Sequence, residues 1–127
     1  MTDTPATNAI EVVRLKRRPQ FLFVRAGHAQ RNKSMVVQGR RRADDGCVGA
    51  GFTATKKIGN AVVRNRAKRR LREAARALLP RHGLAGCDYV FIARMDTAHI
   101  GWTRLLDDME AALITLAARL AKTDTTA

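Results

Sequence analysis

Apolar residues recur at helical spacing in the middle of the chain. The positions that share one narrow face are Val63, Ala67, Leu71, Ala74 and Leu78. Asn60 is a favourable N-cap residue, and Pro80 followed by Gly83 favours a stop. The pattern predicts a helix over residues 61–79 that packs one side on a core.

A second amphipathic helix is predicted near the C-terminus. Its apolar positions step by four and three residues, and they are Trp102, Leu106, Met109, Leu113, Leu116 and Leu120. The stripe is shorter than three heptads, so it favours packing on the protein's own sheet over a coiled coil.

Shorter patterns predict a further helix and several strands. Pro19 suits the first turn of a short helix that ends near Ala26, with Gly27 as its C-terminal cap. A turn at residues 44–46 separates the first two of three predicted strands, which cover residues 35–38, 47–55 and 88–94. The glycines of the second strand indicate a bulge or a close approach to the backbone, and the β-favouring third strand is typical of a buried sheet centre. The order of elements indicates an α+β domain, one small sheet with helices packed against it.

The length of 127 residues fits one compact domain, and no apolar run reaches the roughly 18–20 residues of a membrane span. We expect residues 1–13 to be a disordered N-terminal tail, residues 14–122 the folded domain and residues 123–127 a frayed C-terminus. The N-terminus lacks the basic and apolar regions of a signal peptide, and the two cysteines form no C-x-x-C pair. A cytoplasmic protein with reduced thiols is therefore expected.

The net charge of +13 is concentrated in two blocks. Residues 14–42 hold ten Lys or Arg and no acid, and residues 56–82 hold ten with Glu73 as the one acid. Because like charges packed on one small fold repel each other, this field indicates a polyanion partner. Nucleic acid fits better than a membrane surface, since the apolar face of the 61–79 helix has no Trp or Phe anchor.

Cations of the second block crowd the start of the 61–79 helix, where the helix dipole disfavours them; these are Lys56, Lys57 and Arg64. A bound phosphate would make this arrangement favourable, because the free N–H groups of the first turn and the basic side chains would face one anion. Arginine outnumbers lysine by 18 to 6, which suits bidentate phosphate contacts. Three aromatic residues lie in or beside the basic segments, and they are Phe21, Phe23 and Phe52. They could provide surfaces for base stacking or be ordinary residues of the core.

Residues 56–69 resemble the signature of a known family. The segment reads KKIGNAVVRNRAKR, and it is similar to the motif with an Arg-Asn-Arg centre in the protein subunit of bacterial ribonuclease P. The resemblance extends to residues 20–24 and 88–94 and covers residues 14–121. It implies a four-stranded sheet with three helices in the order α-β-β-β-α-β-α, with a left-handed β-α-β crossover that departs from the usual hand.

The resemblance also implies a function. In this family the RNA subunit cuts precursor tRNA with Mg²⁺ during tRNA 5′ maturation, while the protein binds the catalytic RNA and the 5′ leader of the precursor. The residues implied to face RNA are Lys56, Lys57, Arg64, Asn65, Arg66, Lys68, Arg69 and Arg72. The candidates for contact with the leader are Phe21, Phe23, Val24, Thr53 and Thr55. Mg²⁺ is implied to be held mainly by the RNA subunit and the substrate and not by the protein alone, and the free protein is expected to be a monomer with no membrane partner.

One departure from the family concerns aromatic residues. The family often presents them on the sheet face beside the first helix, but the strand at residues 35–38 has none. Stacking of the leader would therefore rest on the first helix or be weak.

Two other functions remain open from the sequence. One is a general RNA- or DNA-binding module of the ribosomal-protein type, with no role in catalysis. The other is a nuclease that works alone, but the three histidines have no carboxylate or Cys at ligand spacing. The acids Asp107, Asp108 and Glu110 are expected to be solvated charges on a helix. We therefore expect neither a catalytic residue nor a metal site in the protein.

Overall fold

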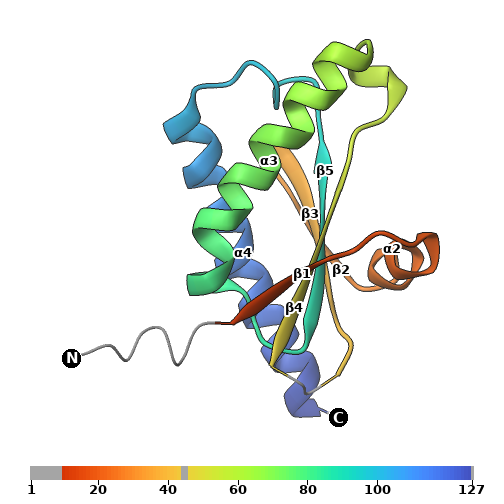
Figure 1. The fold of residues 1–127 in the computed structure, drawn as a ribbon. Helices are drawn as coiled ribbons and strands as arrows, with labels where there is room; N and C mark the ends of the chain where they lie inside the picture. Colours follow the sequence, from red (N-terminus) through yellow and green to blue (C-terminus); the bar gives the residue numbers. More distant parts are fainter. Residues whose placement is uncertain (1–9, 44–45, 127) are drawn as a thin grey trace.

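A computed structural model describes residues 10–43 and 46–126 of the chain. Within these residues a five-stranded sheet is packed with three α-helices (Figure 1). The elements in chain order are β1 (Glu11–Arg14), α2 (Arg18–Arg25), β2 (His28–Arg31), β3 (Met35–Arg41), β4 (Cys47–Thr53), the 3-10 helix η1 (Lys56–Ile58), α3 (Ala61–His82), β5 (Cys87–Ala93) and α4 (Trp102–Thr126). The predicted α+β class is confirmed.

The sheet has the strand order β1-β4-β5-β3-β2 and is mixed. Strands β1, β4 and β5 run parallel to one another, whereas β3 pairs antiparallel with both β5 and β2. The β-favouring run at residues 88–94 thus forms the central strand, as predicted. A strand with neighbours on both edges and layers on both faces needs apolar residues in succession, and every residue of β5 except Ile92 is buried.

The four strands that the resemblance implies are one too few, because residues 11–14 form the additional strand β1. This strand pairs in parallel with residues 47–50 at the edge of the sheet. All four of its residues are exposed, so the sequence carries no alternation of buried and exposed positions that would reveal it. The expected disordered tail over residues 1–13 is therefore too long at its C-terminal end, while residues 1–9 lie outside the described part of the chain.

Helices α3 and α4 lie together on one face of the sheet (Figure 1). The face predicted for α3 is confirmed apart from Val63, which is half-buried; the buried positions are Ala67, Leu71, Ala74, Ala75, Leu78 and Leu79. In α4 the buried stripe begins at Leu105, whereas Trp102, the first residue of the helix, is 43% exposed beside the Arg70 guanidinium. The expectation that Trp102 faces the core is wrong.

The helix ends differ in detail from the prediction. Asn60 caps α3 as expected, since its side-chain oxygen accepts a hydrogen bond from the Val63 N–H at 3.0 Å. The helix continues through Pro80, because that residue lies in the last turn and its missing N–H removes a single hydrogen bond; Gly83 follows the last helical residue. Helix α4 extends to Thr126, past the point where fraying was expected.

Helix α2 packs on the opposite face of the sheet from α3 and α4 (Figure 1). Ala26 takes the C-cap position predicted for Gly27. Gly27 serves close packing instead, because a Cβ there would lie 2.5 Å from the Gly39 carbonyl oxygen. The predicted close approach to the glycines of β4 is confirmed, since a Cβ on Gly51 would lie 2.7 Å from the Phe21 ring. The α2 segment and the sheet thus approach each other at positions where only glycine fits.

Candidate nucleic-acid interface

The start of α3 is fixed by its own backbone. Gly59 has a φ of 147°, in the region that favours glycine, and it turns the chain from η1 into the Asn60 cap. The first turn of α3 contains no acidic residue, while the exposed Lys56 and Lys57 precede it in η1. Positive side chains and the positive end of the helix dipole therefore lie at the same place.

A set of polar and cationic side chains along η1 and α3 has no partner among the residues that the structure describes. No hydrogen bond or ion pair engages them within residues 10–43 and 46–126, and all are at least partly exposed. We call the set the α3 cationic surface, and its members are Lys56, Lys57, Arg64, Asn65, Lys68, Arg69 and Arg72. The single acid of α3, Glu73, pairs with Arg76 at 3.8 Å, so the surface keeps its charge. Seven of the eight residues predicted to face RNA are thus free to do so.

The eighth residue, Arg66, has a partner inside the fold. Its Nε donates a hydrogen bond to the Ala98 carbonyl at 2.9 Å. One turn further, Arg70 donates to the Thr97 carbonyl at 2.7 Å and also to the Ile100 carbonyl. Both arginines hold the loop between β5 and α4 against α3. Arg66 is an exposed residue and uses only its Nε in this bond, so its other guanidinium nitrogens can also bind a ligand.

Arg70 is a residue whose role the sequence does not reveal. Burial, and then the neighbouring Arg66 guanidinium, lower the pKa of Arg70 from its ordinary value. The carbonyls that hold it come from a loop some 30 residues further along the chain, and nothing in the loop's own sequence marks them as acceptors. A basic residue in a cationic helix therefore stabilises the fold.

The acids of α4 also have structural partners. The Asp108 carboxylate accepts hydrogen bonds from the Ser34 hydroxyl at 2.5 Å and from the Arg104 Nε at 3.1 Å. Glu110 lies 2.8 Å from the His82 Nε2, which links α4 to the end of α3. The expectation of merely solvated charges is wrong for these two carboxylates, since each ties α4 to another part of the structure.

The candidates for leader contact on α2 divide by burial. Val24 is fully buried between α2 and the sheet, so its side chain offers no surface to a ligand and this candidate is withdrawn. Phe21 and Phe23 are half-buried and pack against the same small cluster. The Arg40 guanidinium lies 4.2 Å from the centre of the Phe23 ring and donates to the Phe23 carbonyl at 3.0 Å. Both rings therefore belong to the packing of α2 while keeping part of their surface exposed.

The remaining leader candidates lie near the end of β4. Thr53 is its last residue and is half-buried, and the exposed Thr55 immediately precedes η1. Alternation along the strands places Thr53 on the α2 face with Gln38 of β3 and Ile92 of β5, both half-buried. This part of the sheet face carries no aromatic side chain, as the strand sequence indicates. The chain from β4 through η1 connects it to the α3 cationic surface.

Comparison with known proteins gives consistent matches along most of the chain. A family model described as Ribonuclease P matches residues 11–117. The chain is 54% identical over 121 residues to the ribonuclease P protein component of Caulobacter vibrioides, an alignment that covers 94% of this chain and 80% of that protein. It is 50% identical over 111 residues to the ribonuclease P protein component of Ruegeria pomeroyi, covering 85% and 87%. Among solved structures, the ribonuclease P protein of Thermotoga maritima superposes with a TM-score of 0.67 at 27% identity, covering 80% of this chain and 96% of that one.

Proposed function

The chain belongs to the ribonuclease P protein family and so serves as the protein subunit of that endoribonuclease, and we propose how its surface meets RNA. The α3 cationic surface binds phosphates of the catalytic RNA subunit. The observation that carries this proposal is the absence of any intramolecular partner for those side chains within the described residues.

The physical case rests on the charge at the start of α3. Cations at a helix N-terminus cost roughly 0.3–1 kcal/mol each in a free protein, because they oppose the helix dipole. A phosphate at that point is attracted by the dipole, by free N–H groups and by the side chains together. The arrangement is unfavourable without an anion and favourable with one, which suits an RNA partner better than a solvated surface.

The leader of the precursor tRNA binds on the α2 face of the sheet in this proposal. Phe21 and Phe23 supply the aromatic surface, and Thr53 and Thr55 supply hydroxyl groups. Helix α2 lies on the opposite face of the sheet from the α3–α4 layer, and Thr53 lies on the α2 side, so the protein can bind leader and RNA subunit at once (Figure 1). With no aromatic residue on this part of the sheet, we expect modest leader affinity.

The chemistry of cleavage belongs to the RNA subunit in this proposal. Mg²⁺ is held mainly by the RNA subunit and the substrate, and the protein supplies charge neutralisation and positioning. The protein alone is a monomer in the cytoplasm. Within residues 10–43 and 46–126, no helix has the length and apolar character needed to cross a bilayer.

Reconstitution with the RNA subunit and a precursor tRNA tests this division of roles. The protein alone, purified free of RNA, should cleave nothing at any Mg²⁺ concentration. In the holoenzyme, Arg69→Ala should raise the protein concentration needed for half-maximal cleavage several-fold, because a phosphate contact is lost. Arg81→Ala is the matched control, since Arg81 is an exposed arginine of the same helix outside the α3 cationic surface.

A second experiment distinguishes binding of the leader from binding of the RNA subunit. Phe23→Leu keeps an apolar side chain but removes the ring, so it should weaken binding of a precursor tRNA with a leader and leave binding of mature tRNA unchanged. Metal-dependent cleavage by the protein alone, or equal effects of Arg69→Ala and Arg81→Ala, would contradict the proposal.

A further inference from the structure

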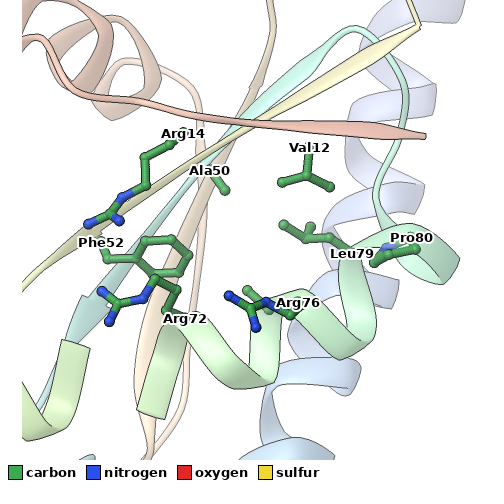
Figure 2. Close-up of a pocket in the computed structure, with 9 residues that line it drawn as sticks. Val12, Arg14, Ala50, Phe52, Arg72, Arg76, Leu79 and Pro80 are labelled. Atoms are coloured by element: carbon green, nitrogen blue, oxygen red, sulfur yellow. The ribbon is translucent and has the colours of Figure 1, made fainter. Parts of the chain in front are cut away.

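A pocket of about 320 Å³ opens between β1 and the second half of α3, on the sheet face opposite α2. Figure 2 shows Val12 and Arg14 of β1 on one side of it and Leu79 and Arg76 of α3 on the other. Phe52 of β4 lies between them. This volume is at the lower end of those found for ligand pockets, so it fits one small group and not a double helix.

The inner wall of the pocket is apolar and contains an aromatic ring held in place. One side of the Phe52 ring stacks on the buried Phe91 ring, with centroids 5.3 Å apart and planes 15° apart. Phe52 itself is half-buried and lines the pocket, and the Arg14 guanidinium lies 5.8 Å from its centre. The Arg14 guanidinium lies over the Phe52 ring, and Arg14 is exposed, so its side chain can move aside and leave a fixed ring on which a flat ring such as a nucleobase can stack.

The rim of the pocket is cationic, and among the described residues one exposed acid alone pairs with it. Three arginines line it, Arg14, Arg72 and Arg76, and no acid does. Within the described residues Arg14 and Arg72 have no ion-pair partner, and Arg76 has the exposed Glu73 at 3.8 Å. Guanidinium groups present paired donors that match phosphate oxygens. The ligand should therefore combine a flat ring with a negative charge.

We propose that the β1–α3 pocket holds one unpaired RNA nucleotide, with its base on Phe52 and its phosphate bound by Arg14, Arg72 and Arg76. This inference rests on the proposed function, because Arg72 also belongs to the α3 cationic surface, one turn from Arg69. A strand lying along that surface can reach the pocket without crossing the sheet. Since the leader candidates lie on the other face, the RNA subunit is the expected source of the nucleotide.

Titration of the free protein with adenosine 5′-monophosphate tests the chemistry of the pocket. The NMR signals of the Phe52 ring and of the Arg14 guanidinium should shift with the mononucleotide, less with inorganic phosphate and less with adenosine, because each control lacks one half of the ligand. The Arg14→Gln variant should lose most of the shift at Phe52. Equal shifts with phosphate alone would overturn the assignment of a base site.

Binding of the whole RNA subunit tests whether the pocket is used. Phe52→Leu should weaken it by roughly 5- to 100-fold, because the stacking of one base is lost. Arg14→Gln should also weaken it, because one guanidinium contact to the phosphate is lost. Arg81→Gln should leave affinity unchanged. Phe52→Leu also removes the ring that stacks on Phe91, so the melting temperature of this variant is measured as well. If Phe52→Leu unfolds, Arg14→Gln, which changes an exposed residue, tests whether the pocket is used.

The outcomes separate this inference from the proposed function. If Arg69→Ala weakens RNA binding while both pocket variants bind like wild type, the pocket is unused and this inference is wrong. If Arg69→Ala also binds like wild type, the proposed function fails. If the pocket variants lose affinity only for precursor tRNA with a leader, the nucleotide in the pocket comes from the leader.

Discussion

The two faces of the sheet differ sharply in how much they bury. The face under α3 and α4 carries a cluster of 21 buried residues that includes Tyr89, Phe91 and Met35. The face under α2 carries, among the described residues, a cluster of three buried apolar side chains, Leu15, Val24 and Val90. One eight-residue helix covers part of that second face and leaves the rest half-exposed. Since burial of apolar surface is the main source of stability, the α3–α4 face stabilises the fold and the other face is left available to a partner.

The comparison also explains where the cations lie. On α3 the buried residues share one narrow stripe, and the arginines occupy the remainder. Two of them, Arg66 and Arg70, are used to hold a loop, whereas the α3 cationic surface is held by nothing in the described chain. Apart from Arg66, the cations that hold the fold and the cations proposed to bind RNA are therefore different residues of this helix.

The largest expected effect is a loss of stability on the α3–α4 face. Leu71→Ala, at a fully buried position, should lower the free energy of unfolding by about 2–5 kcal/mol. Val90→Ala, at the centre of the α2 face and 2% exposed, should cost roughly 1.5 kcal/mol, because it removes two methyl groups from a smaller cluster. Chemical denaturation of both variants measures the difference. Equal losses would show that the two faces contribute alike.

A pH effect should follow from the same buried face. Burial raises the pKa of Tyr89 to about 12, and the hydrogen bond that its hydroxyl accepts from the Leu84 N–H offsets part of that rise. The unfolded tyrosine ionises near its ordinary value of 10.0, so the stabilisation is complete below pH 10 and is lost as the pH rises toward 12.

Tyr89 is the one tyrosine of the chain, so tyrosinate absorbance follows it directly. The folded protein should show a midpoint near 12 and the denatured protein one near 10. In Tyr89→Phe the unfolding free energy should depend less on pH in that interval. A native midpoint at the ordinary value would mean that the ring is open to solvent.

A smaller effect separates the two kinds of arginine on α3. Arg70→Ala removes the donors to the Thr97 and Ile100 carbonyls and should cost about 1–3 kcal/mol. Arg70→Lys should recover only part of the lost stability, because an ammonium group lacks the planar fork that spans both carbonyls. Arg69→Ala should change stability by less than about 0.5 kcal/mol. Thermal melts compare the three, and a large loss for Arg69→Ala would place that residue among the structural arginines.

The strongest sequence signals located the elements of the α3–α4 face. Helical spacing in α3 and the β-favouring run of β5 are local patterns imposed by burial, so they can be found without knowing the partners. The Arg-Asn-Arg motif likewise indicated the cationic surface. The local rules for helix ends predict that α3 stops before Pro80, whereas the helix continues to His82, because proline in the last turn of a helix costs little.

The features that the sequence did not reveal depend on contacts far apart in the chain. Strand β1 is defined by its pairing with β4, and its own four residues show no pattern. The role of Arg70 depends on two carbonyls of a distant loop. The pocket needs β1, β4 and α3 together, so neither Arg14 nor Phe52 could be assigned to it from sequence. The composition establishes the net positive charge, but the fold is needed to find which cations have no partner among the described residues.

The salt dependence of RNA-subunit binding tests the central claim most directly. For wild type, the logarithm of the binding constant should fall linearly with the logarithm of salt concentration. Arg64→Ala and Arg69→Ala should each reduce that slope by roughly 0.7–0.9, the value for one lost phosphate contact, with unchanged melting temperatures. Arg81→Ala should keep the wild-type slope. If the Arg64 and Arg69 variants keep the slope and affinity of wild type, the α3 cationic surface is only a solvated face and the claim that it binds RNA is wrong.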